Sequence, residues 1–307
     1  MLDPSRRILL DASLEVAWAQ WTVVGSAAAS GRRATAIIDP EALVLLSLTL
    51  MDAEKRLWDL MAGWTPTASR LLSVGRTKNL LKVFPASTAS RIRQFAKLAV
   101  DVGKDRRWEN LAGAALDQAP RTGKVGRVVA ELIEPPALTL RLRLGFGVGV
   151  KPDTLAFLLG TKGAWASVKE IAEATQYTTI GVRAGAEELA GARLVRETAS
   201  RPVQYSVDVD AWARVLEIHA GAVPLWRHWS AVFALVADLS EWQTRDASTA
   251  SPYVISSQAR DFIERHRSAF ERNRIIVPRP QDYVGEAYLT AFEETVVKLA
   301  RWMRENV

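Results

Sequence analysis

Cysteine is absent from all 307 residues of the chain, and histidine occurs only three times. Without cysteine the chain can form neither a disulfide nor a zinc site built on thiolates. The histidines, His219, His228 and His266, lack the spacing of a metal-binding helix such as HExxH. We therefore expect no catalytic residue, no metal and no cofactor, and we expect the histidines to be ordinary residues on helix surfaces.

Long apolar runs are missing as well. No stretch reaches the roughly 20 apolar residues that cross a bilayer, and the longest candidate, at about 230–239, is flanked by tryptophan and charge. The N-terminal segment carries charges early and has no small-residue cleavage site, unlike a signal peptide. We expect a cytoplasmic protein with no membrane partner, in agreement with the absence of cysteine.

Basic residues are concentrated in one part of the chain. Residues 91–151 hold 12 of the 40 Lys and Arg but only 6 of the 34 Asp and Glu, so the remainder has 28 of each. The whole net charge of +6 therefore comes from this stretch. Two interpretations remain open: a patch that collects phosphates, or a solvated arginine-rich surface.

Apolar periodicity predicts a mainly α, multi-helical protein. Residues 1–130 are expected to form a helical N-terminal domain, with Asp39 capping one helix ahead of Pro40, and to contain a second helix-turn-helix-like unit or a plain helical subdomain. Residues 131–150 are expected to be a linker. Alternating leucines at 138–144 predict a short strand there, and GFGVG at 145–149 is interpreted as linker because no helix is expected to open on it. Residues 211–307 are expected to be helical again.

Residues 151–210 carry the most specific pattern. Ser167 and Glu170 form an S-x-x-E capping box at the start of one helix, and a second helix is expected at 178–190. Gly191 is expected to end that helix in a left-handed conformation. A two-stranded hairpin is expected at about 194–209, with Arg201 at its tip.

The segment SVKEIAEATQYTTIGVRAGAEELAGARLVRE resembles the winged helix-turn-helix of MarR- and ArsR-type transcriptional regulators. The resemblance covers about 60 of the 307 residues and implies a central winged helix with a two-stranded β wing. It also implies a regulator, rather than an enzyme, that binds double-stranded DNA. A weaker resemblance is to the multi-domain regulators that accompany nucleotidyltransferase toxins in abortive-infection systems.

The resemblance implies a DNA-reading helix at 178–190. Arg183 would pair with a guanine, and Tyr177, Thr178 and Thr179 would contact phosphates at the helix N-terminus. Further phosphate contacts would come from Lys169, Arg196 and Arg201.

The charge of this segment argues against DNA binding. Residues 152–209 hold six basic but seven acidic residues, so a scaffold that binds a protein partner is the alternative.

A homodimer through the terminal helices is expected because one recognition helix reads only a few base pairs. Trp226, Trp229 and Trp242 would line an effector pocket or belong to the core; no small-molecule or protein effector can be identified from the sequence.

Overall fold

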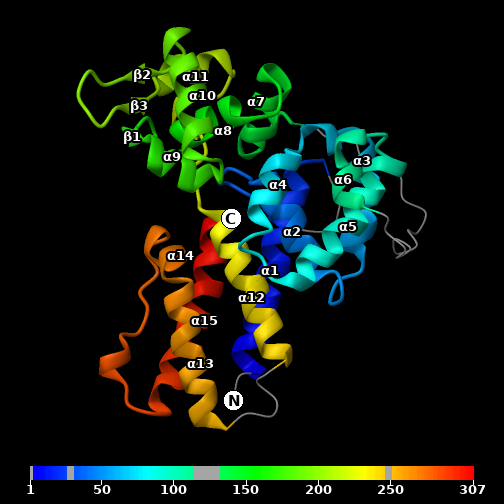
Figure 1. Ribbon diagram of the computed structural model, residues 1–307, viewed down its shortest axis with the longest axis vertical. Helices are drawn as coiled ribbons and strands as arrows, with labels where there is room; N and C mark the ends of the chain where they lie inside the picture. Colours follow the sequence, from blue (N-terminus) through cyan, green and yellow to red (C-terminus); the bar gives the residue numbers. More distant parts are fainter. Residues whose placement is uncertain (1–2, 26–30, 114–131, 246–250) are drawn as a thin grey trace.

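The computed structural model describes residues 3–25, 31–113, 132–245 and 251–307 (Figure 1). These residues form fifteen α-helices and one small antiparallel sheet of three strands. The expectation of a mainly α protein is confirmed. Two hydrophobic cores divide the described chain into two units.

The larger unit, here called the helical body, combines helices from both ends of the chain. Helices α1 and α15 run side by side, and α2 packs against α12 (Figure 1). The helices of the body are α1 (Asp3–Val23), α2 (Pro40–Leu50), α3 (Arg56–Ala68), α4 (Val74–Leu80), α5 (Ala86–Asp101), α6 (Glu109–Ala112), α12 (Trp229–Arg245), α13 (Pro252–Arg265), α14 (Arg267–Arg272) and α15 (Ala287–Asn306).

Helix α2 is the central element of the body. Its sequence is apolar on nearly every side, and all but one of its residues are buried among α1, α3, α5 and α12. The predicted cap is confirmed, because the Asp39 carboxylate accepts a hydrogen bond from the backbone N–H of Ala42 at 3.1 Å. The indole of Trp21 on α1 donates to the hydroxyl of Ser47 at 2.9 Å. A mainly apolar helix is thus packed against neighbours on nearly every side.

The smaller unit, here called the sheet unit, spans residues 138–215. The strands are paired in the order β1-β3-β2, both pairs antiparallel. Buried side chains from helices and strands meet in one core, among them Leu155, Ile171, Val182 and Tyr205. Its elements are α7 (Leu138–Phe146), α8 (Val150–Gly160), β1 (Ala166–Ser167), α9 (Val168–Thr175), α10 (Thr179–Gly191), β2 (Arg196–Glu197), β3 (Gln204–Ser206) and α11 (Val209–Val215).

Local signals in the sheet unit are confirmed in part. The capping box is present: Ser167 Oγ accepts from the N–H of Glu170, and Glu170 accepts from the N–H of Ser167 at 2.8 Å. The left-handed cap at Gly191 is wrong, because Gly191 is still helical and Arg193 adopts the positive φ of 59°. The left-handed residue therefore comes two positions later than predicted. The turn there is closed by a hydrogen bond from the N–H of Leu194 to the carbonyl of buried Leu189 at 2.9 Å.

The strand predicted at 138–144 is wrong, since this segment is helix α7. Alternating leucines suggested one buried face, but α7 lies between both cores. Leu138 and Leu142 enter the core of the sheet unit, whereas Leu140 enters that of the body. A helix covered on opposite sides can bury every second residue, so period two did not indicate a strand here.

Two further expectations change. Helix α8 begins at Val150, immediately after the GFGVG segment, although no helix was expected to open there. The hairpin strands are shorter than predicted, and β1 was not foreseen. A strand of two residues leaves too short a pattern to detect by alternation.

A cluster of five buried charges joins the two units, and we call it the charge cluster. The residues are at most 4% exposed: Asp39 and Glu41 at the start of α2, Arg76 on α4, Arg143 on α7 and Asp153 on α8. Arg76 makes two hydrogen bonds of 2.6 Å to Asp39 and one of 2.5 Å to Glu41. Arg143 contacts Asp153 at 2.6 and 2.8 Å and Glu41 at 2.6 Å.

The charge cluster has one carboxylate more than it has guanidinium groups. Neutral donors supply the difference: the N–H of Ser73 donates to Glu41 at 2.6 Å, and the hydroxyl of Tyr177 donates to Asp153 at 3.0 Å. Burial alone would raise the pKa of Glu41, but Arg143 and Arg76 outweigh it and lower this pKa to about 2. Glu41 is therefore ionised at neutral pH.

Removing one arginine should leave buried carboxylates without a partner. We expect Arg143→Met to lower the free energy of unfolding by about 3–5 kcal/mol, measured by urea denaturation at pH 7. Arg141→Met is the matched control, because Arg141 is on the same helix and pairs with no carboxylate among the described residues. Equal free energies of unfolding for the two variants would show that the charge cluster does not stabilise the contact between the units.

Candidate nucleic-acid interface

Helix α10 projects one face into solvent because its other face fills the core. Val182, Ala186 and Leu189 are buried, whereas Thr179 and Arg183 are exposed. Thr178 is the N-cap of the helix, and its hydroxyl accepts from the N–H of Gly181 at 3.1 Å. The spacing of apolar residues that predicted this helix therefore also predicts which of its side chains are exposed to solvent.

The turn before α10 is attached to the helical body. Gln176 adopts the left-handed conformation with φ 60°. Its carbonyl accepts from the Asn79 amide at 3.0 Å, and the carbonyl of Thr175 accepts from Arg76 Nε at 2.7 Å. Both donors lie on α4, so the body fixes the direction in which α10 leaves the turn.

The seven residues predicted for DNA contact differ in their exposure to solvent. Six are exposed, namely Lys169, Thr178, Thr179, Arg183, Arg196 and Arg201, whereas Tyr177 is half-buried. The Tyr177 hydroxyl donates to Asp153 of the charge cluster, and burial raises its pKa. Tyr177 is thus engaged in holding the units together, which sequence spacing could not reveal because Asp153 lies 24 residues away.

The exposed basic residues differ in how free they are. Arg196 donates from Nη2 to the carbonyl of Val207 at 2.9 Å, and Lys169 lies 4.0 Å from Glu173. Arg183 and Arg201 make no hydrogen bond or ion pair with any described residue. Among the basic residues predicted for DNA contact, Arg183 and Arg201 thus have guanidinium groups that are free to contact a ligand.

Burial changes the charge balance of this segment. Residues 152–209 include seven acidic residues, of which Asp153 is buried and paired in the charge cluster. Six basic and six acidic residues of this segment remain outside the cluster. Glu188 pairs with Lys151, and Glu170 is part of the capping box. The surface is neutral overall rather than acidic.

The described part of the basic stretch at 91–151 brings Lys151 beside α10, where it pairs with Glu188. The helices α5 and α6 lie at the right edge of the body in Figure 1, apart from α10. Arg107 pairs with Asp105 at 2.7 Å, Lys97 lies 3.2 Å from Asp101, and Arg143 is buried. The basic loop predicted at 121–127 lies outside the described residues.

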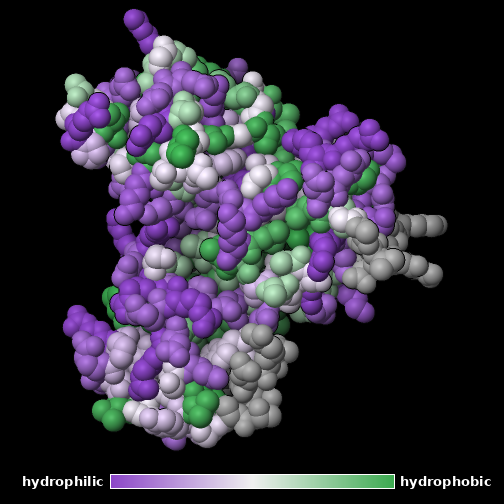
Figure 2. All heavy atoms as spheres, viewed as in Figure 1, coloured by the Kyte–Doolittle hydropathy of each residue, from purple (hydrophilic) through white to green (hydrophobic). Residues whose placement is uncertain are grey.

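Apolar side chains are also exposed on the sheet unit, between hydrophilic ones (Figure 2). Phe146 is 44% exposed and Val215 is 73% exposed. They border a hollow of about 480 Å³ with Trp212 in its wall. Its arginines are Arg141, Arg193 and Arg196, so we call it the arginine hollow.

Sequence reasoning missed the arginine hollow because it depends on α7 being a helix. As a strand, the segment would have placed Arg141 and Phe146 on opposite faces. Trp212 is held by a 3.0 Å hydrogen bond from its indole to the carbonyl of Leu194, a contact between distant elements.

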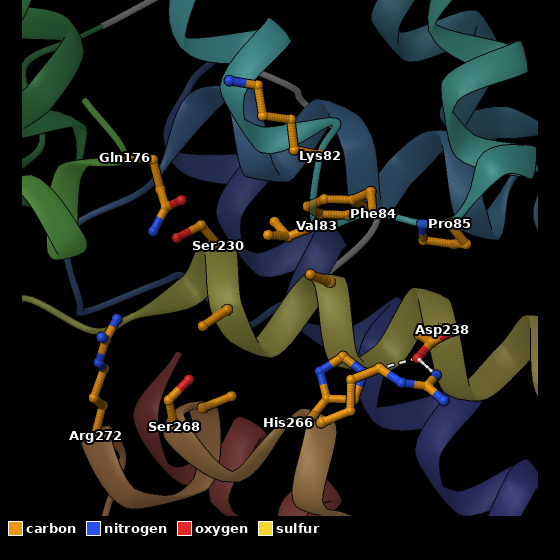
Figure 3. Close-up of a pocket in the computed structure, with 14 residues that line it drawn as sticks. Lys82, Val83, Phe84, Pro85, Gln176, Ser230, Asp238, His266, Ser268 and Arg272 are labelled. Atoms are coloured by element: carbon orange, nitrogen blue, oxygen red, sulfur yellow. Dashed lines mark hydrogen bonds and ion pairs between the residues drawn. The ribbon is translucent and has the colours of Figure 1, made fainter. Parts of the chain in front are cut away.

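A second cavity lies between the helical body and the α9–α10 turn (Figure 3). It measures about 380 Å³, and we call it the junction cavity. Asp238 accepts from Arg265 at 2.8 Å and contacts His266 Nε2 at 2.8 Å. Burial would raise the pKa of Asp238, but these two neighbours lower it. Neither Ser230 nor Ser268 hydrogen-bonds to His266, so the cavity contains no assembled nucleophile and base.

The tryptophans and histidines mostly belong to the interior. Trp229 and Trp242 are buried in the body, and Trp226 packs edge-on against Phe157 at 5.4 Å. The expectation of surface histidines fails for His228, which is half-buried, and for His266, which caps α13.

Within the described ranges, no cluster of histidine and acidic side chains has the arrangement of a metal site. Nor does any described helix combine the length and apolarity that crossing a bilayer requires. No protein-family model matches the chain, and neither a curated protein nor a solved structure matches it.

His228 makes stability depend on pH. Burial and the nearby Arg272 lower its pKa from 6.5 to about 4. The folded state therefore binds fewer protons than the unfolded state between these values, and stability falls as pH drops through this window. We expect His228→Gln to remove roughly 2 kcal/mol of the decrease between pH 6.5 and 4, measured by urea denaturation. Parallel pH profiles of variant and wild type would contradict this.

Proposed function

We propose that residues 150–206 form a winged helix-turn-helix and that the protein is a DNA-binding transcriptional regulator. The order helix, strand, helix, helix, strand, strand, with sheet order β1-β3-β2, supports the winged-helix part. The observation that carries the DNA-binding part is the solvent face of α10, where Arg183 is exposed and unpaired while Val182 and Ala186 are buried.

Helix α10 and the hairpin offer complementary kinds of contact. In the major groove, Arg183 would donate two hydrogen bonds to a guanine edge. Thr178 and Thr179 lie at the N-terminus of α10, where free N–H groups favour a phosphate. Arg201 in the β2–β3 connection would reach only the backbone of the duplex, as would Lys169 and Arg196.

A homodimer remains part of the proposal because a neutral module offers few phosphate contacts. The terminal helices are weaker candidates for the interface than the sequence indicated. Buried residues of α15, such as Phe292 and Leu299, pack within the chain's own core. A single mass twice that of the chain in light scattering at micromolar concentration would support the dimer.

Two arginines separate base reading from backbone contact. We expect Arg183→Ala to weaken binding to a selected site by roughly 1–3 kcal/mol and to relax preference at one base pair. Arg201→Ala should weaken selected and random duplexes equally and reduce the salt slope by about one. Affinities are measured at several salt concentrations on sites selected from a random library.

Arg106→Ala is the control, because Arg106 is exposed on the helical body. Thermal melting should be unchanged in all three variants, since each side chain is exposed. If Arg183→Ala and Arg201→Ala bind like wild type, α10 does not read DNA.

A second candidate function is supported by the arginine hollow. Three arginines around exposed Phe146 and Val215 complement an apolar, acidic segment of a partner protein. A salt titration on random duplex DNA separates the candidates. A steep loss of affinity with salt favours DNA, and no binding at low salt favours the partner protein.

A further inference from the structure

The junction cavity is lined by elements of both units. Its walls come from the α4–α5 connection, α12, the end of α13, α14 and the turn between α9 and α10. Gln176, Ser230, Ser268 and Arg272 lie around one end, and Asp238 and His266 lie around the other (Figure 3). A molecule bound there would touch the body and the turn before α10 together.

Ser230 is the unusual residue of this cavity. It is only 4% exposed, yet its hydroxyl makes no hydrogen bond with any described residue. In Figure 3 the hydroxyl points into the open space, toward Gln176. The hydroxyl faces the cavity, so a ligand that supplies an acceptor can bind it without breaking an existing hydrogen bond.

The backbone at Ser230 adds a second donor. Helix α12 has 17 residues and begins at Trp229. The N–H groups of Trp229 and Ala231 are bonded to nearby carbonyls, but that of Ser230 is not. The positive end of the α12 dipole therefore coincides with two unused donors on one residue.

A guanidinium group lies at the same end of the cavity. Arg272 of α14 points toward it (Figure 3) and is paired with Glu173 of α9 at 2.7 Å. After burial, Arg272 is the second cause that lowers the pKa of His228, so its positive charge acts close to the start of α12.

The carboxylates nearby are already committed. Asp238 lies at the far end and is held by Arg265 and His266. Glu173, which is half-exposed, is the one anion that competes for Arg272. An incoming anion would exchange with Glu173, not add to it.

We propose that the junction cavity binds a small molecule carrying a phosphate group, held by Ser230 and Arg272. A phosphate has enough acceptor oxygens for the hydroxyl and N–H of Ser230, the guanidinium of Arg272 and the hydroxyl of Ser268. The apolar wall beside this end, with Phe84 and Ala234, would cover the remainder of the molecule.

The size and enclosure of the cavity favour a small ligand. Its volume of about 380 Å³ lies in the range of small-molecule sites. A hydroxyl as buried as that of Ser230 is not accessible to the backbone of a DNA duplex. The proposal does not depend on DNA binding, and it would give the turn at Gln176 a ligand-dependent contact.

Calorimetry with three probes tests the ligand class. We expect adenosine 5′-monophosphate or inorganic phosphate to bind the wild-type chain and adenosine to bind far more weakly. Tighter binding of the nucleotide identifies a phosphate ester as the ligand, and equal binding identifies free phosphate. The proposal is overturned if neither phosphate probe binds at millimolar concentration, or if adenosine binds as well as its monophosphate.

Four variants test the site. Ser230→Ala and Arg272→Gln should weaken binding of the better phosphate probe at least about tenfold. Arg267→Gln, on the same helix α14 but outside the cavity, should bind like wild type. Glu173→Gln should bind more tightly, because the competing carboxylate is gone.

The glutamate variant distinguishes binding from a structural role. If the Arg272–Glu173 pair only stabilises the fold, Glu173→Gln should weaken binding as Arg272→Gln does, and this outcome would refute the proposal. Unchanged binding in Ser230→Ala would refute it as well. Circular dichroism and melting of each variant show that it is folded before its affinity is compared.

Discussion

The charge cluster is the interaction on which the rest of the structure depends. Each of α2, α4, α7 and α8 contributes to it, and Glu41 is bonded to arginines on two different helices, α4 and α7. Through Tyr177 and the carbonyl of Thr175 it also reaches the turn that directs α10. Because an unpaired charge in this interior would be strongly unfavourable, the relative placement of the two units is determined by side-chain geometry as well as by the hydrophobic effect. The proposed recognition helix is thus carried on a fixed support.

What could be predicted from the sequence was local. The caps at Asp39 and Ser167, the apolar stripe of α10 and the exposure of Arg183 each depend on residues within a few positions of one another. The errors arose where distant segments decide. The leucines of α7 alternate because two cores cover that helix, and the left-handed residue after α10 is Arg193 because the packing of the following strand sets the end of the helix.

The candidate sites show the same division. Arg183 and Arg201 could be chosen from sequence because exposure follows from helix and hairpin periodicity. Tyr177 looked equivalent, yet its partner lies on another helix. Neither the arginine hollow nor the junction cavity could be foreseen, since each requires the order in which helices pack. The excess of arginine and lysine at 91–151 was visible, but much of it neutralises carboxylates locally or is buried, so composition alone overstated the available positive surface.

The helical body is built from two pieces of chain, one before and one after the sheet unit, and α1 packs along α15. During synthesis from the N-terminus, α1 and the apolar faces of α2 must therefore wait for α12 and α15, whose residues are made last. The sheet unit has its own core from one continuous segment and is able to form while the body is still open. The contacts that close the body join residues far apart in the sequence, and contacts of this kind generally form slowly. Until then α2 is the segment most exposed to aggregation or to capture by a chaperone, although in the finished protein it is among the least accessible.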